Sequence, residues 1–124
     1  MDRLGRDDLF YKIIDKENLG ALSMIDDVVN INFQDKNGYS YLHAAAQSGS
    51  IEIIKKLLSK GADIDIRDKF GKTPLIVAIS EYHPEYRNDR AIIDLLIENG
   101  ADIEAKTNSN IVCKEFAKMR GVEL

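Results

Sequence analysis

Residues 35–65 read DKNGYSYLHAAAQSGSIEIIKKLLSKGADID and contain every element of one structural unit. The segment opens with the turn residues Asp-Lys-Asn-Gly, in which Gly38 is free to adopt the positive φ that such turns need. Apolar residues at helical spacing predict a short helix over 41–47 and a second helix over 51–59, with Ser50 as the N-cap of the second. We therefore expect a helix, a turn and a second helix, followed by an extended link to the next turn.

The same unit recurs along the chain at a constant spacing. Three positions repeat in each unit. The aspartate is Asp2, Asp35 and Asp68, the glycine is Gly5, Gly38 and Gly71, and the leucine is Leu9, Leu42 and Leu75. The sequence Gly-Ala-Asp-Ile appears at 61–64 and again at 100–103, later than this spacing predicts, so the third unit carries six extra residues. Repeats are expected at about 2–34, 35–67 and 68–106, followed by a cap over 107–124. Because neither helix of a unit is stable alone, the units must stack, as in a solenoid.

Composition narrows the classes of function. The chain has 124 residues, of which 44% are hydrophobic and 31% charged, and we expect a single domain over 1–124. No apolar run approaches the roughly 18 residues of a membrane-spanning helix, and the charged N-terminus lacks a secretory signal, so a cytoplasmic protein without membrane contact is expected. The net charge of −4 disfavours binding to nucleic acid. One cysteine, Cys113, excludes an internal disulfide framework.

The repeated positions resemble the ankyrin repeat. The third unit carries Thr73-Pro74-Leu75 after Asp68 and Gly71, and the second carries Leu42-His43, Ala45-Ala46, Leu57-Leu58 and Gly61-Ala62-Asp63-Ile64. The resemblance implies an all-α ankyrin-repeat solenoid of three repeats plus a single-helix C-terminal cap, with stacked helix-turn-helix units and short hairpin loops. It also implies structural roles for Gly38, His43, Gly71, Thr73 and Pro74, with His43 hydrogen-bonding within its turn.

The chain departs from the ankyrin pattern at several positions. Ile76 replaces the usual histidine of the third unit, and Asn110 stands at a glycine position in the last. The last unit has only one helix, on which Val112, Phe116 and Met119 form one apolar stripe. Polar ends of this kind are typical of capping units, so we expect a complete small protein rather than a fragment of a longer array. A monomer, or a weak homodimer through the cap helix, is expected.

The resemblance also indicates where a partner would bind, because hairpin tips and first helices line a concave face in such a stack. The candidates are Arg6, Lys36, Asn37, Tyr39, Gln47, Lys69, Phe70, Lys72, Glu81, Tyr82, Tyr86 and Arg87. Tyr39 and Phe70 are the expected anchors, since an aromatic side chain brings a large contact area at small entropic cost. Alternatively, each folds back over its own turn. The insertion at 81–90 is either a binding loop or a tolerated surface insertion.

Three classes of function follow. The first is a non-catalytic protein-binding module, most concretely an inhibitor or immunity protein that neutralises a cognate toxin or enzyme; the acidic balance of the chain favours a basic partner. The second is a regulatory or host-interacting binder of another protein. The third, an enzyme with a site in the groove, has little support, because the repeat frame places neither His43 nor His83 beside Cys113. Asp7 and Asp8 indicate a helix start rather than an acid–base pair. No cofactor and no metal are expected.

Overall fold

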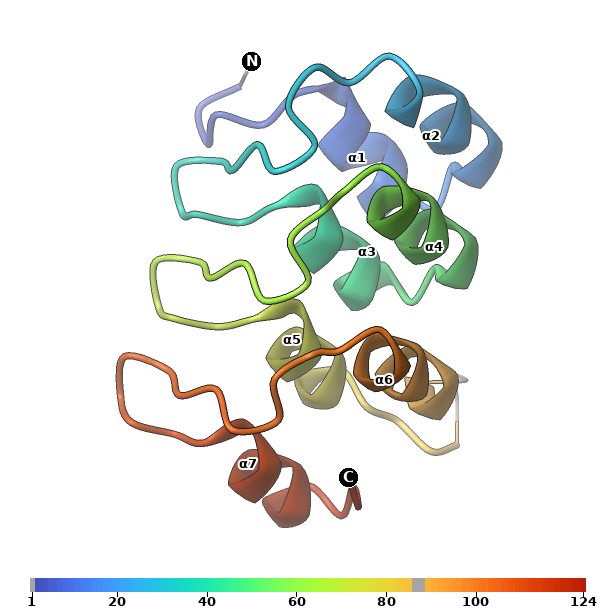
Figure 1. Ribbon diagram of the computed structural model, residues 1–124. Helices are drawn as coiled ribbons and strands as arrows, with labels where there is room; N and C mark the ends of the chain where they lie inside the picture. Colours follow the sequence, from blue (N-terminus) through green and yellow to red (C-terminus); the bar gives the residue numbers. More distant parts are fainter. Residues whose placement is uncertain (1, 86–88) are drawn as a thin grey trace.

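The computed structural model describes residues 2–85 and 89–124, which form helices joined by hairpin loops (Figure 1). The helices are α1 (Asp8–Ile14), α2 (Asn18–Ile25), α3 (Tyr41–Ser48), α4 (Ile51–Ser59), α5 (Pro74–Ser80), α6 (Asp89–Glu98) and α7 (Cys113–Met119). In the part of the chain that the structure describes there is no strand, only isolated bridges from Gln34 to Ser40 and from Lys106 to Val112. The expected all-α solenoid is confirmed.

The helices form two layers (Figure 1). The first helices of successive units follow one another along the stack, with α1 against α3, α3 against α5 and α5 against α7. The second helices α2, α4 and α6 lie beside them, and the hairpin loops project from the opposite side of the first helices. Within residues 2–85 and 89–124, no helix is both long enough and apolar enough to cross a membrane.

The first helices begin where the sequence offers a side-chain cap. Asp7, Ser40 and Thr73 precede α1, α3 and α5, and the side chain of each accepts a hydrogen bond from the backbone N–H three residues further on. Ser50 caps α4 in the same way, as its position predicted. At the other end of α3, Gly49 takes a left-handed conformation with φ of 76°, which residues other than glycine adopt at a cost.

The core lies between the two layers and is built from the repeated apolar positions. Leu9, Leu42 and Leu75 are each at most 2% exposed, and burial of such a side chain contributes about 1.5–3 kcal/mol. Residues 74–79 are all buried, because α5 is covered by α3, α6 and α7. The expected apolar stripe of α7 differs at Met119, which is 83% exposed. Met119 is the last residue of the helix, and α7 instead buries Cys113 and Ala117.

Main-chain hydrogen bonds join successive hairpin loops. The Lys36 N–H donates to the carbonyl of Leu4 at 2.8 Å, and the Lys69 N–H donates to the carbonyl of Asn37 at 2.9 Å. The loops approach so closely at Gly38, where φ is +75°, that an added Cβ would lie 2.8 Å from the Lys69 nitrogen. The hairpin tips are therefore held as one continuous, rigid edge of the molecule.

Candidate protein-interaction surface

A hollow of about 440 Å³ lies where the second hairpin loop (residues 35–39) and the third (residues 68–72) meet α5. We call it the groove. Its lining residues are Arg6, Asn37, Tyr39, Asp68, Lys69, Phe70, Lys72, Val77, Ser80 and Glu81. Seven of these ten are among the twelve residues that the sequence indicated as partner-binding candidates. The fold therefore gathers most of those candidates around one concavity.

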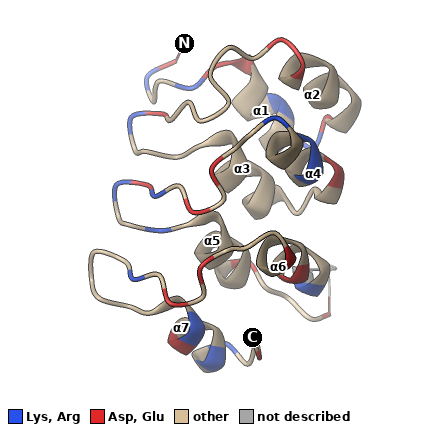
Figure 2. Ribbon diagram, viewed as in Figure 1, with Lys and Arg blue, Asp and Glu red and all other residues tan. Residues whose placement is uncertain are grey.

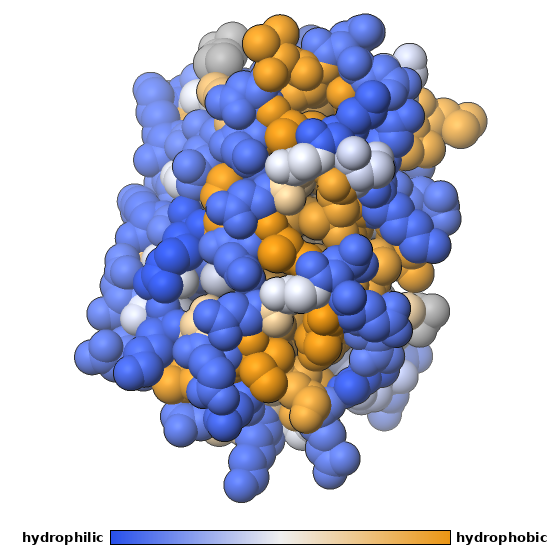
Figure 3. All heavy atoms as spheres, viewed as in Figure 1, coloured by the Kyte–Doolittle hydropathy of each residue, from blue (hydrophilic) through white to orange (hydrophobic). Residues whose placement is uncertain are grey.

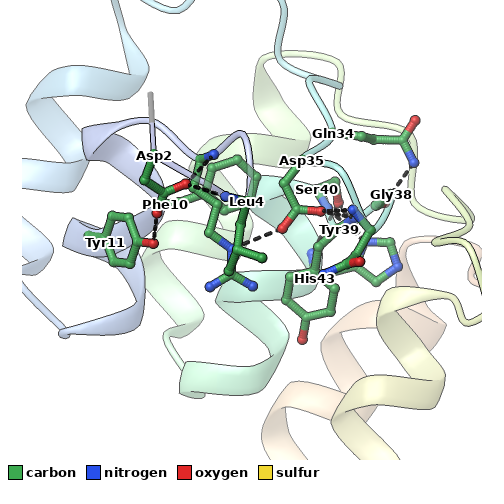
Figure 4. A network of polar contacts seen from close by, with 12 residues as sticks. Asp2, Leu4, Phe10, Tyr11, Gln34, Asp35, Gly38, Tyr39, Ser40 and His43 are labelled. Atoms are coloured by element: carbon green, nitrogen blue, oxygen red, sulfur yellow. Dashed lines mark hydrogen bonds and ion pairs between the residues drawn. The ribbon is translucent and has the colours of Figure 1, made fainter.

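Arg6 is fixed by a polar network that joins the first hairpin loop to the second (Figure 4). Its Nε donates to Oδ2 of Asp35 at 2.9 Å, and the Asp35 side chain is completely buried. The other oxygen of Asp35, Oδ1, accepts from the backbone N–H groups of Asn37 and Tyr39 at 2.8 and 2.9 Å. The guanidinium also lies 5.8 Å from the centroid of the Tyr39 ring. Because Asp35 balances its charge, Arg6 mainly shapes the wall of the groove.

Tyr39 folds back onto α3, which is the alternative that the sequence left open. Its ring stacks on that of His43, with the centroids 4.9 Å apart and the planes at 25°. Its hydroxyl donates to Oε1 of Gln47 at 2.7 Å. Burial, with smaller effects of Glu81 and Asp68, raises the pKa of the Tyr39 hydroxyl well above its ordinary value. Tyr39 and Gln47 therefore hold one another, and only part of the tyrosine ring faces the groove.

Phe70, in contrast, is 55% exposed at the tip of the third hairpin loop. Its backbone is fixed, because its N–H donates to Oδ1 of Asp68 at 2.9 Å and its carbonyl accepts from the Asn108 N–H at 2.9 Å. The ammonium groups of Lys69 and Lys72 lie 5.2 and 5.8 Å from the ring centroid. The ring is thus an exposed apolar surface on a rigid support, flanked by positive charge.

Charge is distributed unevenly over each unit (Figure 2). Basic residues recur in the hairpin loops, namely Arg3, Arg6, Lys36, Lys69 and Lys72. Acidic residues recur in the loops that follow the second helices, namely Asp26, Asp27, Asp63, Asp65, Asp102 and Glu104. In Figure 3, apolar side chains form a broken band along the stack with hydrophilic ones on both sides. The lining of the groove is mixed in charge: Lys69 and Lys72 lie at the Phe70 side, Asp35 balances Arg6, and Asp68 and Glu81 are its acidic members.

Of the remaining partner-binding candidates, Lys36, Gln47 and Tyr82 do not line the groove. The side chain of Lys36 is exposed on the second loop but does not line the hollow. Tyr82 is half-buried, and its carbonyl accepts from Nη2 of Arg120 at 3.2 Å, which links it to the end of α7. Tyr86 and Arg87 are outside the described residues. Among the described residues of the insertion, 81–85 and 89–90, only Glu81 lines the groove.

His43 connects two hairpin loops. Its Nδ1 accepts from the Ser40 N–H at 3.1 Å, and its Nε2 donates to the carbonyl of Lys72 at 2.8 Å. Burial lowers the pKa of the His43 imidazole, although the Lys72 carbonyl opposes the effect. The neutral ring with its proton on Nε2 satisfies both bonds. His43 is therefore engaged in holding the groove in shape rather than in proton transfer.

Cys113 is buried at the start of α7, and burial raises the pKa of its thiol to about 12. A thiol in that state is a poor nucleophile. Among the described residues, no group of three or more histidine, cysteine, aspartate or glutamate side chains is placed to hold a metal ion.

Three groove residues, Asp68, Val77 and Ser80, were not among the candidates from the sequence. The sequence identifies Asp68 as a repeated turn residue. That structural role gave no reason to expect its side chain at the groove as well. Val77 lies on α5 four residues before Glu81, so the two are on one face of the helix, and helical spacing from Glu81 could have indicated it. Ser80 agrees with the expectation that the first helices line the concave face.

A stack of helix pairs whose projecting loops form a rigid concave edge is the architecture of a helical-repeat protein that presents a binding surface. A family model described as ankyrin repeats, in three copies, matches residues 5–107, and the chain belongs to the ankyrin repeat family. Members of this family generally act as protein-interaction modules without catalysis.

Comparison with curated proteins finds relatives with ankyrin repeats. An ankyrin repeat-containing protein of Schizosaccharomyces pombe is 31% identical over 101 residues, which cover 82% of this chain and 45% of that protein. A putative ankyrin repeat protein of Rickettsia felis is 38% identical over 78% of this chain and 44% of its own length. Protein phosphatase 1 regulatory subunit 27 of Mus musculus is 39% identical over 62% of this chain and 46% of its own length. The chain thus spans less than half the length of these relatives.

Proposed function

We propose that this chain binds a partner protein in the groove, and that binding inhibits or neutralises the partner, in the manner of an immunity protein acting on a toxin or enzyme. The observation that carries the proposal is Phe70, which is 55% exposed on a backbone held at both its N–H and its carbonyl. A rigid aromatic side chain at a concave surface is the kind of group that dominates binding energy in interfaces.

The groove favours a partner segment that carries carboxylates beside an apolar side chain. Lys69 and Lys72 flank the Phe70 ring, so a carboxylate close to the ring would meet an ammonium group on either side. The net charge of −4 suggested a basic partner, but association follows the local potential of the contact surface. A partner that is basic overall therefore has to present an acidic segment to the groove, or to use a second surface as well.

A second candidate function is regulation of a partner that stays active in the complex. It is favoured by the name of one relative, protein phosphatase 1 regulatory subunit 27, which is a regulatory subunit. Both candidates use the same groove. They differ in whether the bound partner loses its activity.

The experiment is capture of the partner from cells of the source organism on immobilised chain, followed by an assay of the partner's activity in the purified complex. The wild type is compared with Phe70→Ala and with Leu19→Ala, a matched truncation of a side chain that is 87% exposed on the outer helix α2. We expect capture by the wild type and by Leu19→Ala, roughly tenfold weaker capture by Phe70→Ala, and a partner inactive in the complex. If all three proteins capture the partner equally, the proposal that it binds in the groove is contradicted. If the bound partner stays active, the result supports regulation instead of inhibition.

A further inference from the structure

A second hollow, also of about 440 Å³, lies at the N-terminal end of the stack. The end of α2, the start of α1 and the loop before the second hairpin enclose it. Its lining includes Asp7, Asp27, Val29, Phe33 and Tyr41, and within residues 2–85 and 89–124 no lysine or arginine lines it. We call it the acidic hollow. It matches the groove in size, but its charged lining residues are all acidic, whereas those of the groove are of both signs.

The acidic hollow exists because the first unit lacks the turn that closes the others. In the second unit, Gly61 at φ +92° ends α4 and allows the Ala62 N–H to donate to the carbonyl of Leu57 at 3.0 Å. The equivalent positions of the first unit are Val28 and Val29, and a β-branched valine does not adopt a left-handed φ readily.

The two units part only at the last bond of this turn. The Asp27 and Val28 N–H groups donate to the carbonyls of Met24 and Ile25, as the equivalent Lys60 and Gly61 N–H groups do to those of Leu57 and Leu58. In the described residues, however, no bond from the Val29 N–H corresponds to that of Ala62. The Val29 side chain is turned fully into solvent, with a relative exposure of 102%. The space that the closed turn fills in the second unit is therefore open in the first.

The walls of the acidic hollow combine negative charge with aromatic and aliphatic surface. The Asp7 carboxylate accepts from the Tyr41 hydroxyl and from the Phe10 N–H, and neither donor is a cation. The Asp27 carboxylate is exposed, with no ion pair among the described residues, whereas its neighbour Asp26 pairs with two lysines, Lys56 at the end of α4 and Lys60 just beyond it. The rings of Phe33 and Tyr41 lie 6.1 Å apart. Two carboxylates whose charge is not paired, above an apolar floor, are complementary to a cation on an aliphatic stem.

We propose that the acidic hollow receives an arginine side chain from a basic segment of a partner protein, with the guanidinium against Asp27 and Asp7 and the methylene stem over Phe33. Charge complementarity and size both favour this occupant. The volume of the acidic hollow falls within the roughly 300–1,000 Å³ of pockets that hold ligands. The site is separate from the groove, so a single partner can present an acidic segment to one and a basic segment to the other.

The test is a titration, followed by ¹⁵N–¹H NMR, of the whole chain with the peptide acetyl-Gly-Leu-Arg-Leu-Gly-amide. Matched peptides carry citrulline, which has the same shape without the charge, or glutamate in place of arginine. We expect saturable shifts of the amides of residues 27–30 with the arginine peptide, at least threefold weaker binding with citrulline, and none with glutamate. Equal binding of the arginine and citrulline peptides, or shifts confined to the groove, would overturn the proposal.

Two variants locate the binding. Asp27→Asn is expected to weaken the arginine peptide about threefold, and Asp26→Asn to leave it unchanged, because the Asp26 carboxylate is already paired. The double variant Val28→Gly with Val29→Ala restores the turn of the second unit, so it should close the hollow and abolish binding while the melting temperature stays the same or rises. Loss of binding with a lower melting temperature counts against the proposal, as does full binding by this double variant.

Discussion

The second and third hairpin loops share a backbone and differ in what their side chains do. In both, one aspartate oxygen accepts from the N–H groups two and four residues further on, Asp35 from Asn37 and Tyr39 and Asp68 from Phe70 and Lys72. The second loop is tied to its surroundings, with Asp35 paired to Arg6 and Tyr39 stacked on His43. The third loop instead leaves Phe70 exposed between two lysines.

This difference separates stability from binding on one surface. In the repeat, Lys72 is the equivalent of Tyr39 and Ile76 is the equivalent of His43, so the third loop lacks both partners of the stack that anchors the second. Phe70 is the equivalent of Asn37, at a tip that no ring of the second loop occupies. We infer that the second loop fixes the groove and that the third meets the partner. Substitutions in the second loop should therefore lower the free energy of unfolding, and those in the third should lower the affinity for the partner.

The largest expected effect is that of Asp35→Ala. The variant leaves Arg6 without its buried counterion and removes two hydrogen bonds to backbone N–H groups, which together should cost about 3 kcal/mol of unfolding free energy. The equivalent Asp68→Ala removes only the two loop hydrogen bonds and should cost about 1 kcal/mol. Urea unfolding of both variants measures the two costs, and equal losses would contradict the distinction between the loops.

The next effect is that of His43→Ala, which should cost about 2 kcal/mol because the Ser40 N–H and the Lys72 carbonyl each lose a partner in a buried place. It should also change the pH dependence. Burial lowers the pKa of folded His43, so the unfolded chain takes up this proton at higher pH than the folded chain. The stability due to neutral His43 is thus fully present above its unfolded pKa of about 6.5 and is lost as the pH falls from there through the lower pKa of the folded state.

The check is the unfolding free energy at pH 7.5 and at pH 5.5. We expect the wild type to lose stability between the two, and His43→Ala to lose less. Leu19→Ala is the control, because it truncates an exposed side chain that does not titrate and should leave the wild-type dependence intact. A pH dependence as large in His43→Ala as in the wild type would contradict the assignment to His43.

A smaller effect is expected from Tyr39→Phe. This change keeps the ring on His43 and removes only the hydroxyl that donates to Gln47 at an exposed position, so the loss should be about 0.5 kcal/mol. Gln47→Ala should cost a similar amount of unfolding free energy. The double variant should lose no more than the larger single loss plus a few tenths of a kcal/mol, because the two changes remove one shared bond. Additive losses from thermal or urea unfolding would show that the Tyr39–Gln47 bond does not hold the tyrosine.

The repeat predicted the architecture because it fixes which positions must be buried and where turns must fall. Leu9, Leu42 and Leu75 are core residues for that reason, and the cap before α4 followed from Ser50. The sequence also grouped most residues of the groove. It could not decide whether Tyr39 or Phe70 stays exposed, since that depends on the ring of His43 and on an arginine from the preceding unit.

The acidic hollow was missed for a related reason. Periodicity marks the positions that agree with the repeat, whereas the hollow comes from a disagreement, the valines at 28 and 29 in place of glycine and alanine. Overall charge also hides the local surfaces, because the basic residues of the hairpin loops and the acidic residues after the second helices offset one another in the net value of −4. Local surfaces, rather than the sum, decide what each face can bind.

The central claim is that the third hairpin loop carries the affinity for a partner. Once the partner is in hand, its dissociation constant for the wild type, Phe70→Ala and Tyr39→Phe tests this directly, with unfolding free energies measured on the same samples. We predict that Phe70→Ala weakens binding about tenfold or more while its stability stays within about 0.5 kcal/mol of the wild type, and that Tyr39→Phe binds within twofold of the wild type. Wild-type affinity in Phe70→Ala together with lost affinity in Tyr39→Phe would contradict the account.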